Sequence, residues 1–574
     1  MPSASPSPPP FFQDPPRLGN TWDSDPLLRS LLARLLPADV ARQAVPHLRH
    51  LGERAAGDLL SMAELAEAQP PRHVPFDAWG RRVDRLELSP GWTALKRASA
   101  EEGLVAIAYE GRHGAAARLY QHGLLYLFGP SAATYLCPLA MTDGAARLLA
   151  TGIDPELAAR TLPRLTSRDP ERFWTSGQWM TERAGGSDVG GTATVADPDG
   201  SGGWRLSGSK WFTSAIDSDV AFTLARLPGA RAGSGGLSLF YVELRDAAGC
   251  LQGIRLERLK DKLGTRALPT AELTLEGTPA SLVGGEGGGV RRIATLMNVT
   301  RVYNANAAVA GMRRAFELAR AYARRRHAFG RVLLAHALHR ETLAAMAVEV
   351  AAGLVLLFRA VALQGLEEHG EASAEERALL RLLTPLVKLE TGRQAVAVAS
   401  EALEAFGGAG YVEDTGLPRL LRDAQVLTIW EGTTNVLALD ALRAIDREEA
   451  LPALLADAER LLAPLPAGAT AAVRAALDGA AASARASDDA ERREAGARVA
   501  ARGLARAYAG ALLLDQARWS GAAGDAAAPL WAAAAARWSA GLDTAGGSLA
   551  ADVDGARLLA LEEPAEAAAF LPGG

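Results

Sequence analysis

The sequence predicts a mostly α-helical α+β protein in which one β domain lies between two helical regions. Two observations favour this fold class. Apolar residues recur every three or four positions over long stretches on both sides of the middle of the chain. Between about residues 175 and 290 they fall instead into short, partly alternating runs separated by Gly, Pro and Asp clusters. A nucleotide-binding βαβ unit is not expected, because no Gly cluster follows a strand and opens a crossover helix.

At 574 residues the chain is long enough for three or four domains. The changes of period divide it into five parts. An irregular Pro-rich start (1–20) is followed by a helical N-terminal domain (21–174) and a middle antiparallel β-barrel domain (175–290). A four-helix bundle (291–444) and an extra C-terminal helical domain (445–574) complete the chain.

The helical N-terminal domain opens with a capping signal. Asp23-Ser-Asp-Pro26 precedes a Leu-rich segment, and this order predicts a helix with a proline in its first turn. The β domain is predicted from four short runs, at residues 204–207, 220–225, 237–244 and 271–276. It is expected to end at the Gly-rich segment 284–289.

Four long helices are predicted for the bundle. Apolar stripes at residues 302–319 and 343–361 give two of them. Ser373-Ala-Glu-Glu376 is a capping box that opens a third, in which Pro385 is a candidate kink. The fourth is expected after Glu431, and short connections make the bundle antiparallel.

The C-terminal extension is Ala-rich, and its breaks are expected at Pro464, Gly479 and Gly521. Residues 441–574 hold 13 Arg, no Lys and 18 Asp plus Glu, a formal charge of −5 that equals the charge of the whole chain. Within it, Arg498, Arg502 and Arg506 are four residues apart and would share one helix face.

Composition excludes several classes of function. A net charge of −5 and a pI of about 6.1 give no basic footprint for nucleic acid. Two cysteines are too few for a disulfide framework, so a cytoplasmic protein is expected. No metal site, signal peptide or membrane helix is expected, because the ligand spacing, the leader pattern and a 20-residue apolar span are all missing from the sequence. Only five of the 61 basic residues are Lys, a bias attributed to a GC-rich genome.

Five sequence elements occur in one order along the chain: Met180-Thr-Glu-Arg-Ala-Gly-Gly-Ser-Asp-Val189, Lys210-Trp-Phe-Thr213, Arg326-His-Ala-Phe-Gly330, Gly407-Gly-Ala-Gly410 and Ile429-Trp-Glu-Gly-Thr433. Together with the domain order, they resemble the acyl-CoA dehydrogenase family. The segments Trp22–Leu28 and Arg258–Gly264 and the long extension are most similar to its AidB-like branch, which is linked to the bacterial response to DNA alkylation.

The resemblance implies an FAD-dependent enzyme that desaturates an acyl-CoA thioester. Glu431 would be the base that removes the α-proton while the β-hydrogen leaves as hydride to flavin N5. A carboxylate in a partly desolvated site has a raised pKa, which makes it a stronger base near neutral pH. The alternative for Glu431 is a solvated acid at a helix start, stabilised by the helix dipole.

The resemblance also implies the cofactor-binding residues, which are Thr181, Gly186, Ser187, Trp211, Phe212, Thr213, Arg326, Phe329, Gly407, Gly408, Trp430, Thr433 and Asn435. Of these, Arg326, Phe329, Gly407 and Gly408 would reach the flavin of a neighbouring subunit, so a homo-oligomer, a tetramer by resemblance, is expected. An electron-accepting flavoprotein is a further expected partner.

Each element also has a purely structural interpretation. Trp211 could be a strand-core aromatic, Gly186-Ser-Asp188 a β-turn, and the segments at Arg326 and Gly407 helix C-termini. Three positions depart from the family pattern. Glu404 replaces a common Gln, Ala337 replaces a polar residue, and Thr300 stands where the isovaleryl-type subgroup carries its base. Arg301, beside it, could orient a substrate group or neighbouring backbone.

Two other functions stay open at this stage. An AidB-like protein would associate with DNA and have weak dehydrogenase activity, with contacts from Arg492-Arg493 and the Arg498, Arg502, Arg506 series. A solvated helix face is the favoured interpretation of those arginines, because the extension is net acidic. An oxidase on the same fold is the third option, although nitroalkane-oxidizing relatives carry Asp in place of Glu431.

Overall fold

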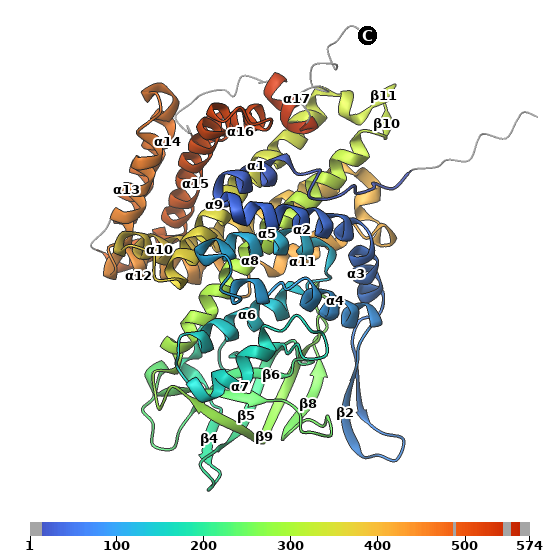
Figure 1. Cartoon of the computed structure of the whole chain (residues 1–574), viewed down its shortest axis with the longest axis vertical. Coiled ribbons are helices and arrows are strands. Elements are labelled where there is room, and N and C mark those ends of the chain that lie inside the picture. The colour runs from blue at the N-terminus through green and yellow to red at the C-terminus, as the bar shows by residue number, and fades with distance from the viewer. Residues whose placement is uncertain (1–13, 486–488, 543–552, 563–574) are drawn as a thin grey trace, which may run out of the picture.

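The computed structural model describes residues 14–485, 489–542 and 553–562, and Figure 1 shows their arrangement. Most of the predicted irregular start, residues 1–13, lies outside the described part. Helices occupy the upper two thirds of the view in Figure 1, and the strands of the β domain form the lower part.

The N-terminal domain is helical, as predicted. Asp25 caps its first helix by accepting a hydrogen bond from Leu28 N at 2.9 Å, and Pro26 occupies the first turn. The helices are α1 (Pro26–Leu35), α2 (Ala38–Ala56), α3 (Asp58–Ala68), α4 (Pro90–Glu101), α5 (Ala117–Phe128), α6 (Leu136–Ala150) and α7 (Pro155–Leu165).

A hairpin in this domain was not predicted from the sequence. Its strands are β1 (Arg72–Phe76) and β2 (Arg82–Glu87), and they pair antiparallel. Their charged residues give no alternating apolar face, so the period-two signal is missing. The hairpin meets the β domain instead, where Asp84 Oδ2 accepts from Leu256 N at 3.1 Å.

The middle domain is a small barrel of β3 (Ser176–Trp179), β4 (Val195–Pro198), β5 (Trp204–Ser214), β6 (Val220–Arg226), β7 (Leu237–Glu243), β8 (Ile254–Leu259) and β9 (Thr270–Val283). The pairings β4–β5–β9–β7–β6–β4 close into a ring. The expectation of purely antiparallel pairing is wrong at two places, since β3 and β4 run parallel to β6. The long connections before β6 supply the crossover that a parallel pair requires.

The bundle contains the four predicted helices, α8 (Gly289–Ala323), α9 (Ala337–Glu368), α10 (Ala374–Ala405) and α12 (Thr434–Arg447). The capping box at Ser373 and Glu376 is present, and α10 continues on both sides of Pro385. A short helix, α11 (Pro418–Val426), precedes α12, and β10 (His327–Ala328) and β11 (Arg331–Val332) form a hairpin between α8 and α9.

Helix α9 is long and apolar enough to cross a membrane on length and composition alone. However, 83% of its most apolar 18-residue window is buried inside the protein. Helix α9 is therefore a core helix of the bundle, and it is apolar because neighbouring helices bury it on all sides.

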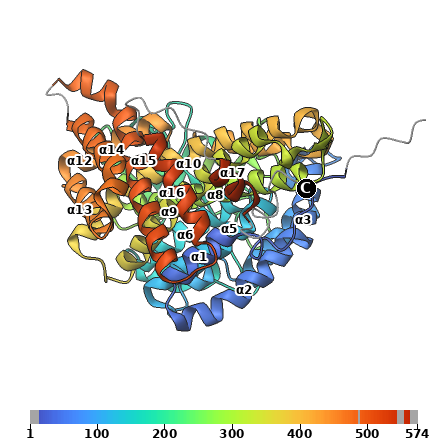
Figure 2. The ribbon, with the colours of Figure 1, turned by 90° about the horizontal axis from the view of Figure 1, so that it is seen from above.

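The extension consists of α13 (Ala450–Leu462), α14 (Ala467–Arg485), α15 (Ala490–Ala522), α16 (Ala528–Leu542) and α17 (Val553–Leu561). The chain breaks near Pro464 and Gly521 as predicted, but Gly479 lies inside α14 and does not end it. Figure 2 shows α13, α14 and α15 gathered on one side of the molecule, with α2 and α3 on another.

Ion pairs attach the extension to the bundle. The Glu390 carboxylate of α10 is fully buried and accepts from Arg502 Nε and from Arg506 Nη1, both at 2.9 Å. Arg506 also pairs with Glu349 of α9 at 3.1 Å. Two of the three arginines of the predicted basic stripe thus have carboxylate partners inside the molecule.

Candidate active site

Glu431 lies in the turn between α11 and α12, at the start of the fourth bundle helix. Its φ angle of 58° is in the left-handed region, and Gly432 follows with φ 105°. A residue with a Cβ adopts this conformation at a cost of about 1–2 kcal/mol, so other contacts must hold it. The solvated alternative for Glu431 does not fit, because its carboxylate lines a cavity and is hydrogen-bonded to Thr300 of α8.

Two buried cations hold the backbone of this turn. Arg301 Nε donates to the carbonyl of Glu431 at 3.3 Å, and Lys388 Nζ donates to the carbonyl of Gly432 at 2.5 Å. Arg301 is itself fixed by Asp440 of α12 at 2.8 Å. These contacts orient the Glu431 side chain toward α8. Arg301 therefore holds neighbouring backbone, which is one of the two roles considered for it from the sequence.

The Glu431 carboxylate accepts a hydrogen bond of 2.6 Å from Thr300 Oγ1. Burial raises the pKa of Glu431, and this effect outweighs the lowering by Thr300, Arg301 and Lys388. Burial also lowers the pKa of Lys388, to about 7. The carboxylate is therefore a stronger base than a solvated Glu, and Thr300 fixes its orientation.

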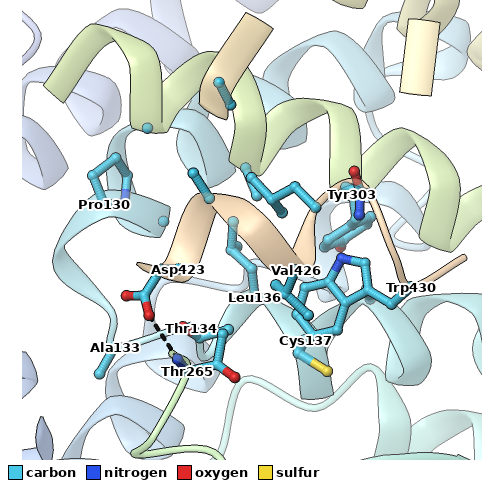
Figure 3. A pocket seen from close by; sticks show the side chains of 18 of the residues that line it. Pro130, Ala133, Thr134, Leu136, Cys137, Thr265, Tyr303, Asp423, Val426 and Trp430 are labelled. Atoms are coloured by element: carbon cyan, nitrogen blue, oxygen red, sulfur yellow. Dashed lines mark hydrogen bonds between the residues drawn. The ribbon is translucent and has the colours of Figure 1, made fainter. Parts of the chain in front are cut away.

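Trp430 stands beside the carboxylate and is fixed from α8. The Asn304 amide, with its oxygen toward the indole, accepts from Trp430 Nε1, and its nitrogen donates to Leu427 O at 3.2 Å. Because the indole N–H is satisfied in this way, the ring is held at one end of the cavity, next to Tyr303 (Figure 3).

The cavity encloses about 140 Å³ between α6, α8, α10 and α11. On α8 its wall follows one face, with residues spaced four, three, four and three apart: Thr300, Asn304, Ala307, Gly311 and Arg314. These 14 positions correspond to about 21 Å along the helix axis. In Figure 3, Trp430 and Tyr303 lie at one end and Pro130 lies at the other.

The residues expected around the flavin ring come together at the edge of the barrel. Trp211 N donates to Thr181 O at 2.9 Å, which joins the first two motifs. The buried Glu182 carboxylate holds their loop, since it accepts from Lys210 Nζ at 2.8 Å and from Ala193 N at 2.7 Å. Phe212 is exposed on β5, and Gly186 and Ser187 are exposed on the loop.

Thr213 supplies an independent sign of a missing partner. Its side chain is buried, yet Oγ1 has no hydrogen-bond partner within the described residues. Buried hydroxyls are normally satisfied, so a group that accepts or donates here is expected. Asp188 has the turn role predicted for it, since it accepts from Gly190 N at 2.8 Å.

Four expected cofactor residues lie at the opposite end of the bundle. Arg326 and Phe329 belong to the segment after α8, and Phe329 is 94% exposed at the tip of the β10–β11 hairpin. Gly407 and Gly408 are exposed just after α10, where the Phe406 ring contacts Tyr322 of α8 at 4.8 Å. Figure 1 shows this end far from the barrel, so one chain does not bring these residues to Trp211.

Thr433 and Asn435 lie on the same turn as Glu431. Thr433 caps α12 without a side-chain hydrogen bond, and Asn435 is exposed in its first turn. Sequence reasoning missed Lys388, the Thr300 hydrogen bond, and Arg314 and Arg419 in the cavity wall. Lys388 had a usable signal, because it is one of only five lysines in the chain.

Three family models match the chain in domain order. They are the adaptive response protein AidB N-terminal domain at residues 13–171, the acyl-CoA dehydrogenase middle domain at 177–278 and the acyl-CoA dehydrogenase C-terminal domain at 287–445.

Similar proteins agree with these matches. Acyl-CoA dehydrogenase family member 11 of Caenorhabditis elegans is 47% identical over 449 residues, 76% of this chain and 73% of that protein. AidB of Escherichia coli (strain K12) is 34% identical over 450 residues, 77% and 78% of the two chains. The crystal structure of C. elegans ACDH-11 in complex with C11-CoA superimposes with a TM-score of 0.87 at 41% identity, covering 98% of this chain and 94% of that one. The chain therefore belongs to the acyl-CoA dehydrogenase family of flavin-dependent oxidoreductases, in its AidB-like branch.

Proposed function

We propose that this protein is an FAD-dependent acyl-CoA dehydrogenase in which Glu431 removes the α-proton of a thioester whose acyl chain occupies the α8–α11 cavity. The observation that carries the proposal is the position of Glu431, a carboxylate of raised pKa at one end of an elongated, mostly apolar cavity. Acyl desaturation requires such a base beside the α-carbon and a channel for the rest of the chain.

The residues present fit FAD, the cofactor of the family. Trp211 offers an aromatic surface at the barrel edge. Thr213, two residues further along β5, has a hydroxyl without a partner among the described residues, and this hydroxyl would bond the flavin ring. When bound, FAD would accept the hydride that leaves the β-carbon. The Glu182–Lys210 pair keeps Thr181 and Trp211 in register for that contact.

The thioester would be oriented by the turn that carries the base. Within the described part of the chain, the backbone N–H of Glu431 donates to no acceptor, so it is available for the thioester carbonyl. Arg301 and Lys388 hold the neighbouring carbonyls and fix the direction of this N–H. The C. elegans relative was crystallised with C11-CoA, which supports an acyl-CoA ligand.

A homo-oligomer completes the site in this proposal. Phe329 and Tyr411 are 94% and 90% exposed; Phe329 follows α8 and Tyr411 follows α10, and the ends of these two helices meet where the Tyr322 and Phe406 rings lie 4.8 Å apart. Exposed large aromatics in one region are typical of an interaction surface. We infer that this end meets the flavin of another subunit, in a tetramer. Sedimentation of the Phe329→Ser variant should show a smaller assembly with less flavin, whereas unchanged mass and flavin content would contradict the inference.

The test of the function is a series of acyl-CoA thioesters mixed anaerobically with the yellow holoprotein. Loss of the flavin absorbance near neutral pH is expected for saturated acyl chains and not for their 2-enoyl counterparts, which lack the hydrogens to be removed. Absence of bleaching by every saturated thioester would contradict the proposal. Prompt hydrogen peroxide formation on exposure to oxygen would instead support the oxidase alternative.

DNA association is a second candidate because the N-terminal domain matches AidB. The charges of the described residues do not favour it. Arg493 pairs with Asp446, and Arg502 and Arg506 pair with Glu390, so these guanidiniums are already matched by carboxylates. A gel shift at about 50 mM salt, where phosphate contacts are favourable, tests it directly, and binding that weakens as salt rises would support it.

A further inference from the structure

The far end of the acyl cavity carries two arginines. Arg314 of α8 and Arg419 of α11 both line the cavity, as does Pro130, whose carbonyl accepts from Arg314 Nη1 at 3.3 Å. Because Pro130 lies opposite Trp430 in Figure 3, the guanidinium of Arg314 is at the end of the cavity away from Glu431. A purely hydrocarbon tail would not require charged groups there.

Arg314 is a buried cation without a carboxylate partner. It is 7% exposed, and it donates to two neutral acceptors, Pro130 O at 3.3 Å and Ser131 Oγ at 2.7 Å. Among the described residues, no carboxylate oxygen lies within 4.0 Å of its nitrogens. Glu317, the nearest acid on its own helix, is paired with Arg313 at 2.9 Å and with Arg320 at 3.3 Å. A buried charge left in this way is costly unless another anion matches it.

Arg419 is also incompletely satisfied. Within the described part of the chain, its guanidinium makes no hydrogen bond, and its ion pair with Asp423 is long, at 3.9 Å. Asp423 accepts a hydrogen bond from Thr265 N at 2.6 Å, and burial raises its pKa. The Lys262 ammonium is a further cation near Asp423. Glu67 is a second carboxylate near Arg419 and Lys262, so three cations (Arg314, Arg419 and Lys262) stand against two carboxylates (Asp423 and Glu67) in this region.

We propose that this end binds the terminal carboxylate of an acyl-CoA derived from a long dicarboxylic acid. The proposal deepens the function argued above and rests on it, because it assumes that the thioester lies at Glu431. The two guanidiniums provide the planar donor pairs that carboxylates prefer. The cavity extends about 21 Å along α8, and an extended chain of roughly 12 to 16 carbons, which advances about 1.3 Å per carbon, spans about 14 to 19 Å and leaves room for the contact of its terminal carboxylate.

The cavity would select such a substrate by its length, because its walls are apolar between Glu431 and the two arginines at the far end. The middle of the cavity is lined by Leu136, Ala307, Val426 and similar apolar side chains. A terminal carboxylate on a shorter chain would stop among these residues and lose its hydration without gaining a partner. A chain of matched length would place it between Arg314 and Arg419.

The experiment compares the holoenzyme with pairs of CoA thioesters of equal length, one ending in a methyl group and one in a carboxylate. For chains of about 12 to 16 carbons, the carboxylate form is expected to have a KM about 10- to 100-fold lower, as for hydrogen bonds to charged groups. For chains below about 8 carbons the preference should reverse. Equal KM values at every length, or a preference for the methyl form throughout, would overturn the proposal.

Variants assign the preference to the two arginines. Arg419→Gln and Arg314→Met should raise KM for the carboxylate substrate and remove the roughly 10- to 100-fold difference in KM between the methyl and carboxylate forms, while Arg314→Lys should keep part of that difference. Arg422→Gln is the matched control, because Arg422 lies on α11, pairs with Glu413 and does not line the cavity. If Arg314→Met does not fold, Arg419→Gln decides the question, and an unchanged preference in it overturns the proposal.

A binding measurement separates this proposal from the proposed function. Titration of the oxidised holoenzyme with the non-reducible 2-enoyl forms reports affinity without catalysis, through the shift of the flavin spectrum. Tighter binding of the carboxylate form supports the cationic end even if no thioester is dehydrogenated. Failure of all thioesters to reduce the flavin, with that preference present, would contradict the catalytic assignment alone.

Discussion

The Thr300 hydroxyl donates a hydrogen bond of 2.6 Å to the Glu431 carboxylate, which joins α8 to the turn before α12. In the sequence Thr300 was significant only because it lacks the carboxylate of another subgroup. In the structure, the residue at this position instead donates a hydrogen bond to Glu431, the proposed base. The hydroxyl stabilises the ionised form of Glu431 and so opposes the effect of burial on its pKa.

Replacing Thr300 with Val should raise the pKa of Glu431. The lost hydrogen bond to a charged acceptor is worth about 1.5–3 kcal/mol, or roughly one to two pKa units. Because the base works in its deprotonated form, the acid limb of the pH–rate profile for flavin reduction should move to higher pH. Thr384→Val, which removes a hydroxyl bonded to Leu380 O inside α10, is the control and should leave the limb in place.

Replacing Lys388 with Met should change how stability depends on pH. Burial lowers the pKa of Lys388 to about 7 from its ordinary value of 10.5, so between these values the unfolded chain binds more protons than the folded one. The free energy of unfolding should therefore rise with pH from about 7 to 10 in the wild type. The variant should lack that part of the rise, as measured by urea unfolding at several pH values. Identical pH dependence in both proteins would remove the buried ammonium from the account.

Replacing Gly311 with Leu should shorten the acyl chains that the enzyme accepts. A Cβ at Gly311 would have no atom within 4 Å, so the new side chain would enter the cavity rather than the helix packing. The exchange also favours the helix by about 1 kcal/mol, so folding should be retained. The acyl-chain length at which kcat/KM is highest should fall by several carbons. Gly479→Leu, at an exposed position of α14, is the control and should leave this length unchanged. An unaltered optimum in Gly311→Leu would place the acyl chain elsewhere.

Replacing Glu390 with Gln should loosen the C-terminal extension. The fully buried carboxylate pairs with Arg502 and Arg506, which are about one third exposed, so we expect a loss of about 2 kcal/mol rather than the larger value of a fully buried triad. Limited proteolysis should cut within α13–α16 sooner in the variant. Flavin reduction should be unaffected, and cleavage that is no faster would show that apolar packing alone holds the extension.

The order of the elements could be predicted because it depends on local patterns. Residues 302–319 carry an unbroken helical stripe, and Ser373 and Glu376 form the capping box that the sequence indicates. The β1–β2 hairpin was missed because its contacts are with another domain, through Asp84 and Leu256. The parallel pairing of β3 and β4 with β6 depends on how distant segments meet, and the sequence carries no local signal of it.

The motifs identified Glu431, and Arg301 was a candidate for orienting the neighbouring backbone, but Lys388 was missed. Lys388 and Arg301 come from other helices, and only the packing of α8, α10 and α12 brings them to the turn. The Arg-rich composition did carry information that was overlooked. Four of the five lysines cluster around the site: Lys210 pairs with Glu182, Lys260 lies 3.4 Å from the centre of the Trp211 ring, Lys262 is near Asp423, and Lys388 holds Gly432.

The role of Glu431 is tested most directly by stopped-flow flavin reduction in the Glu431→Gln variant. Gln keeps the size of the side chain and can still meet Thr300, but it cannot accept the α-proton. The variant should bind FAD and a 2-enoyl-CoA normally and reduce its flavin at least about 10³-fold more slowly than the wild type, as for the loss of a general base. Flavin reduction at the wild-type rate in this variant would contradict the assignment of Glu431 as the catalytic base.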